Sequence, residues 1–128
     1  MSSLEPVSGT NVSNLLNLTH LREVIHSDPP ARASGIEIDP ARRRVRVEGR
    51  DVELTDQEFR LLYLLVTNPG IVFSRPALLA AIWHGNTFVT ARSVDTLVKR
   101  LRRRIEPDTA NPKFLLTIWG VGYKLADA

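Results

Sequence analysis

The chain has 128 residues, of which 43% are hydrophobic and 24% are charged, and it contains no cysteine. These values exclude disordered, collagen-like and membrane-spanning proteins, and they also exclude disulfide bonds, cysteine nucleophiles and thiolate metal sites. The net charge of +3 and the isoelectric point of about 9.8 indicate a polyanionic partner, with nucleic acid ahead of an acidic membrane surface. The first residues show no secretory signal, so we expect a cytoplasmic protein.

The first part of the chain differs in composition from the rest. Residues 1–34 are rich in Ser, Asn, Thr and Pro, and Pro29 and Pro30 stand near their end. We therefore expect a flexible N-terminal segment or linker over 1–34 and one folded domain over 35–128. Within the segment, residues 14–26 place apolar side chains at rough helical spacing. That pattern fits a marginal linker, or a short helix used for self-association.

A period of two begins at Ile36. Ile36 and Ile38 alternate with acidic residues, and residues 44–47 (RVRV) alternate strictly. Turn signals containing proline or glycine separate these runs, so we predict a small antiparallel sheet with one apolar face. The arginines of residues 42–46 are interpreted as solvated side chains at strand edges, where they prevent edge-to-edge pairing.

Two helix starts are marked by capping residues. Thr55 and Glu58 form a capping box, and the helix that follows ends at residues 68–70 (NPG), because proline cannot continue it. After a short extended link, Ser74 caps a second helix. The loop of residues 84–90 then leads to a third helix.

Residues 91–105 (ARSVDTLVKRLRRRI) present two different surfaces at helical spacing. A buried stripe is predicted by Val94, Val98, Leu101 and Ile105, with Leu97 at its edge. Six cations and one acid, Asp95, give the segment a charge of +5; the cations are Arg92, Lys99, Arg100, Arg102, Arg103 and Arg104. Such a helix suits insertion beside a phosphate backbone, although a charge run alone also fits a solvated surface. Asp95 is expected to pair with Lys99, four residues later.

The end of the chain predicts a β-hairpin. Residues 113–118 (KFLLTI) favour a strand, residues 119–122 (WGVG) supply a turn with two glycines, and residues 123–126 return. Because it directly follows a basic helix, this hairpin is a candidate wing that reaches an adjacent minor groove.

Five motifs occur together and in order: LTDQEF, NPG, SRPALL, VDTLVKRLRRRIEP and GVGY. Over residues 36–126 they resemble the winged-helix output domain of OmpR/PhoB-type response regulators. The resemblance implies an α+β winged helix-turn-helix fold, with a three-helix core, an N-terminal antiparallel sheet and a C-terminal hairpin wing. It also implies sequence-specific binding of double-stranded DNA for transcription regulation, with helix 91–105 in the major groove and hairpin 114–126 beside it. Neither enzymatic activity nor a cofactor is expected.

Site residues follow from the basic face and from the resemblance. The expected DNA-binding residues are Arg92, Ser93, Thr96, Lys99, Arg100, Arg102, Arg103, Trp119 and Gly120. Arg100 resembles a base-reading position, and Arg102 lies off the derived face, toward a flanking phosphate. The resemblance further implies contact with RNA polymerase, in activating members, through His84, Gly85, Asn86, Thr87 and Phe88. It also implies head-to-tail pairing of two copies on direct repeats, without a membrane partner.

The apolar Phe88 and Val89 in the loop before the third helix are expected to fold back on the core, the alternative being contact with a partner. Two positions, Trp119 and Leu97, depart from the family pattern. Trp119 stands where many relatives place an arginine that enters the minor groove, so its indole is expected to stack on the DNA backbone or to pack beneath the wing. Leu97 stands where histidine is frequent. The family's receiver domain has no counterpart in residues 1–34, which are too short.

Other classes of function have weaker support. No glycine-rich phosphate loop, HExxH or GxSxG motif occurs, and His20, His26 and His84 are too scattered for a metal site. A protein-interaction module that docks its basic face on an acidic partner is the alternative to DNA binding. RNA binding is a third hypothesis, but no aromatic platform for base stacking accompanies the arginines.

Overall fold

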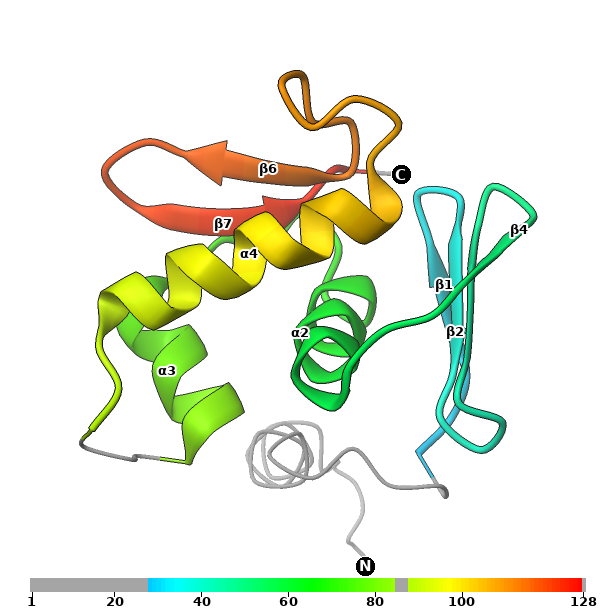
Figure 1. Cartoon of the computed structure of the whole chain (residues 1–128), viewed down its shortest axis with the longest axis horizontal. Coiled ribbons are helices and arrows are strands. Elements are labelled where there is room, and N and C mark those ends of the chain that lie inside the picture. Colours follow the sequence, from blue (N-terminus) through cyan, green and yellow to red (C-terminus); the bar gives the residue numbers. More distant parts are fainter. Residues whose placement is uncertain (1–27, 85–87, 128) are drawn as a thin grey trace, which may run out of the picture.

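The computed structural model describes residues 28–84 and 88–127. An N-terminal sheet, three helices and a C-terminal hairpin confirm the predicted α+β winged helix-turn-helix arrangement (Figure 1). The elements are β1 (Ala31–Ala33), β2 (Ile36–Asp39), β3 (Arg44–Val47), β4 (Arg50–Val52), α2 (Asp56–Val66), β5 (Phe73–Ser74), α3 (Arg75–Trp83), α4 (Ala91–Ile105), β6 (Leu115–Ile118) and β7 (Gly122–Leu125). No helix in this described part has the length and apolar character needed to span a membrane.

The four N-terminal strands form an antiparallel sheet in the order β1-β2-β3-β4. Two of its turns contain consecutive residues with positive φ, namely Ser34-Gly35 (54° and 83°) and Glu48-Gly49 (49° and 81°). This backbone gives tight hairpins whose twist matches that of the strands. The inner face of the sheet packs on α2, and its buried residues are Ile36, Ile38, Val45 and Val47.

The sheet begins before the predicted start of the folded domain. β1 lies inside residues 1–34, which the sequence assigns to a linker, and it pairs with β2 along its whole length. Pro29 is also attached to the folded domain, because its carbonyl oxygen accepts a hydrogen bond from the Tyr63 hydroxyl of α2 at 2.7 Å. The alanines of β1 are too small to give a visible hydrophobic alternation, so no pattern in the sequence marked this strand.

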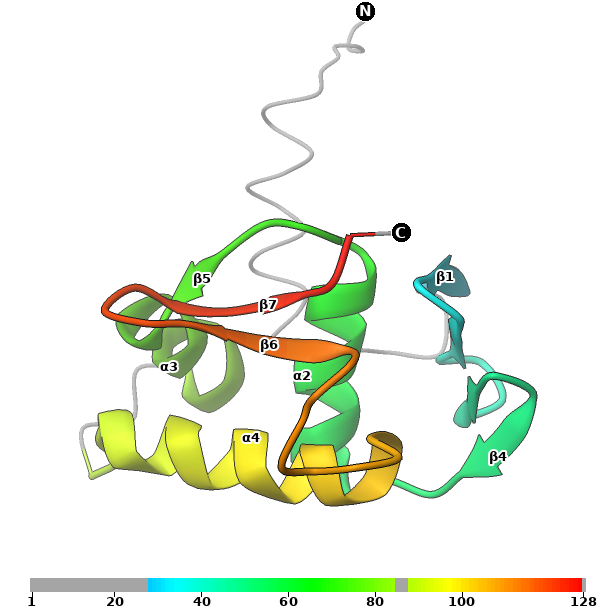
Figure 2. The ribbon, with the colours of Figure 1, turned by 90° about the horizontal axis from the view of Figure 1, so that it is seen from above.

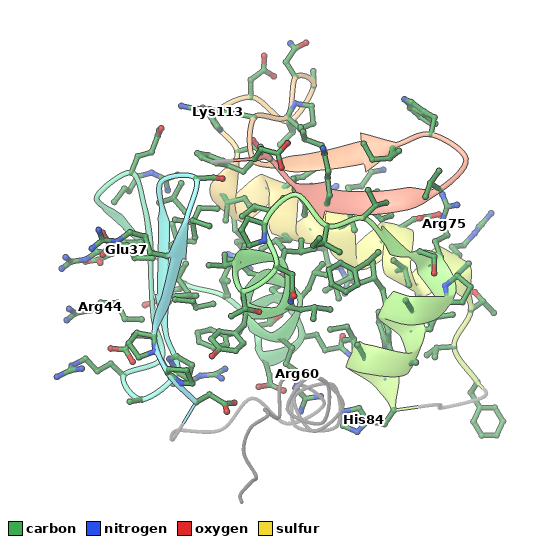
Figure 3. The ribbon with its side chains drawn as sticks, turned by 180° about the vertical axis from the view of Figure 1, so that it is seen from behind. Glu37, Arg44, Arg60, Arg75, His84 and Lys113 are labelled. Atoms are coloured by element: carbon green, nitrogen blue, oxygen red, sulfur yellow. The ribbon has the colours of Figure 1, made fainter. Side chains whose placement is uncertain are left out.

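Charged side chains alternate across the outer face of the N-terminal sheet. Arg32, Glu37, Arg46 and Asp51 lie opposite one another on β1 to β4, and we call this row the charge ladder. Arg32 lies 3.7 Å from Glu37, and Arg46 lies 2.9 Å from Asp51. Figure 3 shows Glu37 and Arg44 on the side of the sheet that faces away from the helices. The arginines of β3 are interpreted from the sequence as side chains that prevent pairing at a strand edge. This interpretation is wrong, because β3 is an interior strand of the sheet.

Two of the described helices, α2 and α3, begin at a side chain that caps the first turn. In the predicted capping box of α2, Thr55 Oγ1 accepts from the Glu58 amide at 3.3 Å, and Glu58 Oε1 accepts from the Thr55 amide at 3.0 Å. Ser74 caps α3 as predicted, since its hydroxyl accepts from the Ala77 amide at 3.2 Å. α4 packs on both α2 and α3, so the core lies between the three helices and the two sheets (Figure 2).

The C-terminal sheet has three strands in the order β5-β7-β6. β6 and β7 are the predicted hairpin, which we call the wing, and the short extended link predicted before α3 forms β5. β5 pairs with β7 at Phe73↔Tyr123 and Ser74↔Gly122. A Cβ atom at Gly122 would collide with the carbonyl oxygen of Phe73, so this close approach of two strands requires glycine.

A buried carboxylate connects the end of α4 to the wing. Glu106, the C-terminal cap residue of α4, is 7% exposed. Its Oε1 accepts from the amides of Lys113 (2.6 Å) and Phe114 (3.1 Å), and its Oε2 accepts from those of Phe114 (3.0 Å) and Leu115 (2.8 Å). Glu106 thereby fixes where β6 starts, a role that the sequence pattern did not indicate.

Candidate nucleic-acid interface

One side of α4 belongs to the core. The predicted stripe is confirmed: Val94, Leu97, Val98, Leu101 and Ile105 are all at most 3% exposed. The helix starts after Thr90, whose amide donates to the Ser93 hydroxyl at 3.4 Å. Ser93 therefore caps the first turn and is half-buried, while the following turns present their other sides to solvent.

The opposite side of α4 gathers cations that have no acidic partner. Its exposed side chains are Arg92, Thr96, Lys99, Arg100 and Arg103. Among the described residues, no carboxylate lies within 4.0 Å of these four cations, although nine other cations form such pairs. Within the same part of the chain, Arg44 and Arg50 on the N-terminal sheet also lack an acidic partner. The largest group of uncompensated charge thus lies on one face of one helix, where it can attract phosphates.

Two open grooves run along α4 beside its cations. One, of about 370 Å³, is lined by Gln57, Trp83, Thr90, Arg92, Ser93, Thr96, Leu97 and Arg100. The other, of about 500 Å³, is lined by Thr55, Gln57, Glu58, Leu97, Arg100, Arg103 and Arg104. Arg100 borders both grooves, so its guanidinium lies at the centre of the exposed surface between α4 and the start of α2. Arg104 is less available, because it lies 3.5 Å from the buried Glu58.

Asp95 lies on the side of α4 that faces the C-terminal sheet. Its Oδ1 accepts from Arg75 Nε at 2.7 Å and from the Tyr123 hydroxyl at 2.6 Å. The predicted pair with Lys99 is wrong, because Asp95 is bonded to Arg75 of α3 and Tyr123 of β7 and forms no ion pair with Lys99 among the described residues. Burial alone would raise the pKa of Asp95, but the hydrogen bonds from Arg75 and Tyr123 outweigh it and leave this pKa below its ordinary value.

The pKa values of Arg75 and Tyr123, the two partners of Asp95, are both raised. The hydrogen bond to Asp95, followed by its charge, raises the pKa of Arg75 further. Burial, followed by the hydrogen bond to Asp95, raises the pKa of Tyr123. Sequence reasoning gave Arg75 and Tyr123 no role, although they stand in the SRPALL and GVGY motifs. They come from distant parts of the chain, and no periodicity relates them. Figure 3 shows Arg75 beside the wing.

Arg102 is half-buried and donates hydrogen bonds to the wing. Its Nε and Nη2 donate to the carbonyl oxygen of Leu115 at 3.1 and 2.8 Å, and Nη2 also donates to Thr117 Oγ1 at 2.8 Å. These bonds turn the guanidinium toward β6. The expected contact of Arg102 with a flanking phosphate stays a prediction.

The tip of the wing is apolar and exposed. Trp119 is 88% exposed and Val121 is 53% exposed, so of the two alternatives for the indole, packing beneath the wing is wrong, and stacking on the DNA backbone stays a prediction. Gly120 has φ +78°, which suits the tight turn between the two strands. No cation occurs among residues 119–122, so this tip offers an aromatic surface and backbone amides rather than charge.

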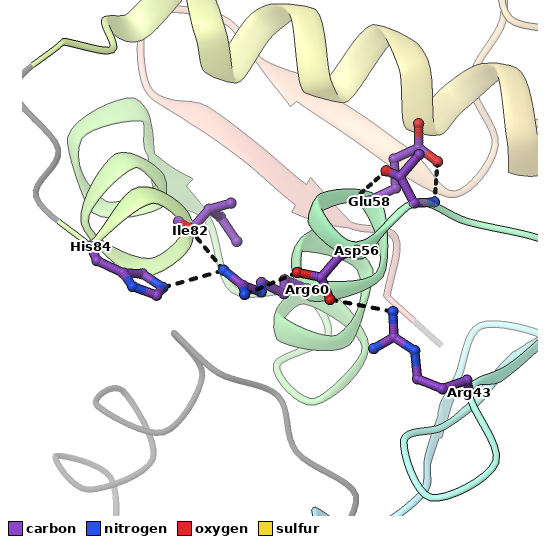
Figure 4. A network of polar contacts seen from close by, with 7 residues as sticks. Arg43, Asp56, Glu58, Arg60, Ile82 and His84 are labelled. Atoms are coloured by element: carbon purple, nitrogen blue, oxygen red, sulfur yellow. Dashed lines mark hydrogen bonds and ion pairs between the residues drawn. The ribbon is translucent and has the colours of Figure 1, made fainter.

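The loop between α3 and α4 begins at a polar network (Figure 4). Arg60 Nη1 lies 3.4 Å from the Ile82 carbonyl oxygen and 3.3 Å from His84 Nε2, and Arg60 Nη2 lies 2.9 Å from Asp56. Asp56 also lies 3.3 Å from Arg43, in the turn between β2 and β3. The start of the loop is therefore tied to α2 and, through it, to the N-terminal sheet.

Only part of the loop expected to contact RNA polymerase is described. Gly85, Asn86 and Thr87 lie outside the described residues. Phe88 is 93% exposed, which contradicts the expectation that it folds back on the core, whereas Val89 is half-buried.

Comparison with known proteins relates this arrangement to transcription regulators. The family model described as "Transcriptional regulatory protein, C terminal" matches residues 49–125. The transcriptional regulatory protein SrrA of Staphylococcus aureus is 38% identical over 118 residues, which cover 88% of this chain and 49% of SrrA. The chain thus spans about half the length of this curated relative.

Solved structures agree with the family match. The response regulator DrrB of Thermotoga maritima, an OmpR/PhoB homologue, superposes with a TM-score of 0.69 at 32% identity, covering 89% of this chain and 52% of DrrB. The DNA-binding domain of Klebsiella pneumoniae RstA, solved in complex with the RstA box, gives a TM-score of 0.67 at 30% identity, covering 77% of this chain and 98% of that domain. The chain therefore belongs to the family of C-terminal effector domains of OmpR/PhoB-type transcriptional regulatory proteins.

Proposed function

We propose that this domain binds double-stranded DNA sequence-specifically to regulate transcription, with α4 in the major groove and the wing beside it. The observation that carries the proposal is the set of exposed cations on α4, opposite its buried stripe, that have no acidic partner within the described ranges 28–84 and 88–127. A helix held in this way presents guanidinium groups without having to break internal ion pairs first. The RstA DNA-binding domain, whose fold is similar and which was solved in complex with the RstA box, supports the same use of the fold.

The proposed contacts divide into base reading and phosphate binding. Arg100 borders both grooves and can take guanine O6 and N7 with two parallel hydrogen bonds, so we assign it to base reading. Arg92, Lys99 and Arg103 supply phosphate contacts, which fix the register of the helix on the duplex. Thr96, which is exposed, and Ser93, which is half-buried, line the groove beside Arg92 and add hydroxyl contacts.

At the wing, Trp119 and Gly120 form the proposed contact with the neighbouring minor groove. The exposed indole can stack on deoxyribose, and the glycine lets the backbone approach closely. Because the tip carries no cation, this contact contributes affinity that depends little on salt.

Selection of binding sites from randomised duplex DNA, followed by footprinting, tests the proposal. Arg100→Ala should cost about 1–3 kcal/mol of binding free energy and relax preference at one base step, while Lys99→Ala should weaken all sequences alike and lower the salt slope by about one. Arg44→Ala is the matched control, because Arg44 is exposed and unpaired among the described residues but lies on the N-terminal sheet. Equal effects of Arg44→Ala and Arg100→Ala would contradict the assignment, and failure to select any site would favour a module that docks on acidic proteins.

The exposed Phe88 supports a second contact of the same regulator, with RNA polymerase. The proposed surface comprises His84, Gly85, Asn86, Thr87 and Phe88, and an aromatic side chain of this exposure is a suitable anchor for a protein partner. Phe88→Ala should leave DNA affinity unchanged and reduce activated transcription in a purified system. We further propose that two copies pair head to tail on direct repeats, that the domain is the output part of a two-component-type regulator in the cytoplasm, and that it acts by binding rather than by catalysis.

A further inference from the structure

Two side chains of α4 hold the wing. Asp95 and Arg102 are seven residues apart, or about two helical turns, so both lie on the side of α4 that faces the C-terminal sheet. Asp95 bonds to Tyr123 of β7, and Arg102 bonds to the Leu115 carbonyl oxygen and to Thr117 of β6. Each strand of the wing therefore has its own polar connection to the helix, and we call this pair of connections the wing clamps.

The wing clamps share an aromatic ring. The guanidinium carbon of Arg102 lies 5.8 Å from the centre of the Tyr123 ring, and that of Arg75 lies 5.9 Å from it. Both distances allow attraction between a cation and the face of the ring. Arg75 and Tyr123 also meet at Asp95, so α3, α4 and both strands of the wing are joined by directional, charge-assisted hydrogen bonds.

The wing needs such connections beyond its base. At the base, Leu115 and Leu125 are buried in the core. Toward the tip, Thr117 and Ile118 of β6 are half-buried and Trp119 is exposed, so apolar packing falls away along β6, whereas Tyr123 of β7 stays buried. β5 supports β7 at only two positions and does not pair with β6, so the hydrogen bonds from Arg102 are the polar contacts that join β6 directly to α4 in the described part of the chain.

We propose that Asp95 and Arg102 are positioning residues that set the angle between α4 and the wing, so that helix and wing tip engage DNA in one register. This inference rests on the proposed DNA-binding function. It gives Arg102 a different role from the phosphate contact expected from the family resemblance. Three of the five N–H groups of the guanidinium, one on Nε and two on Nη2, point to β6 in this structure.

Arg102→Leu tests the proposal, because leucine keeps most of the apolar stem and removes every donor. Arg103→Leu is the matched control: Arg103 is the next residue, is exposed, and bonds to no acid among the described residues. Amide hydrogen exchange of the DNA-free proteins gives the first measurement. We expect faster exchange in β6 and β7 of Arg102→Leu, unchanged exchange in α2, and no change in Arg103→Leu. Unchanged exchange in the wing of Arg102→Leu would overturn the proposal.

DNA binding gives the second measurement, made on the selected site well below the melting temperature. Arg102→Leu should lose protection at the minor groove beside the wing, keep protection under α4, and lower affinity about tenfold, equivalent to ~1.4 kcal/mol. Its salt slope should stay within about half a unit of the parent's, whereas that of Arg103→Leu should fall by about one. A fall of about one unit with intact wing protection would identify Arg102 as a direct phosphate contact and overturn the proposal.

A second variant separates positioning from general stability. Tyr123→Phe removes the hydroxyl that donates to Asp95 and keeps the ring that both guanidinium groups approach. It should reduce wing protection in the same direction as Arg102→Leu, with protection under α4 retained. If footprint protection beside the wing and under α4 fell together, in proportion to the folded fraction measured by circular dichroism, the role of these residues would be merely structural. If the parent domain selects no DNA site, the proposed function fails, and the exchange data still report whether the clamps hold the wing.

Discussion

Glu106→Ala removes a carboxylate that receives the first amides of β6. In the structure its two oxygens accept from the amides of Lys113, Phe114 and Leu115 at 2.6–3.1 Å. Lys113 is exposed, so water can replace the carboxylate at its amide. Phe114 and Leu115 are 1% and 0% exposed, so their amides would be left without an acceptor.

The expected cost follows from these two buried donors. Each costs about 1–3 kcal/mol when it is left unsatisfied, so the pair gives about 2–6 kcal/mol. The wild-type carboxylate carries a desolvation cost that the variant no longer has, and this offsets part of the loss. We therefore expect a destabilisation in the lower half of the range. A domain of roughly 100 residues has a free energy of unfolding of about 5–15 kcal/mol, so the variant should stay folded with a melting temperature at least ~8 °C lower.

Urea unfolding followed by circular dichroism measures the effect. The matched control is Asp108→Ala, in the same connection, where an exposed carboxylate accepts from the Ala110 amide and from Asn111 Nδ2, both at 3.0 Å. Water can satisfy these donors, so the control should lose less than about 1 kcal/mol. A loss for Glu106→Ala within ~0.5 kcal/mol of the control would refute the reasoning about buried amides.

Three further predictions concern titration and packing. Burial, followed by the charge of Asp28, raises the pKa of Tyr63 to about 12. This tyrosine therefore stabilises the fold below pH ~10, and the contribution is lost as the pH rises through about 12. Absorbance at ~295 nm should show this late titration in the native protein and not in Tyr63→Phe. The depressed pKa of Asp95 contributes stability above pH ~4 that is lost in more acidic solution, so unfolding free energies at pH 3 and pH 6 should differ less in Asp95→Asn than in the parent. Gly122→Ala should destabilise the domain and loosen β5, because its Cβ would collide with the Phe73 carbonyl oxygen; thermal melts equal to the parent's would contradict this.

Periodicity and capping predicted most of the fold. The buried stripe of α4 and the capping box of Thr55 and Glu58 depend on residues within a few positions of one another, so local spacing identified them. β1 was missed because its alanines carry no hydrophobic signal. β5 was expected only as an extended link because a two-residue strand is defined by its partner, β7, rather than by its own sequence.

The candidate site was predicted in outline, and its internal connections were not. Helical spacing placed Arg102 off the exposed face of α4, but it could not show that Arg102 is bonded to β6. That bond depends on the path of the wing, which no helical spacing contains. For the same reason Asp95 was assigned to Lys99 on its own helix, whereas the fold supplies Arg75 from elsewhere in the chain.

The charge ladder has an electrical consequence for the whole domain. Its two arginines and two acids cancel, so this row adds no net charge to the outer face of the N-terminal sheet. Arg92, Lys99, Arg100 and Arg103 of α4 have no such compensation among the described residues, so the positive charge of the described part is concentrated on one side of that helix. In the field of a polyanion an uneven charge distribution of this kind experiences a torque, which favours approach of the domain with α4 foremost.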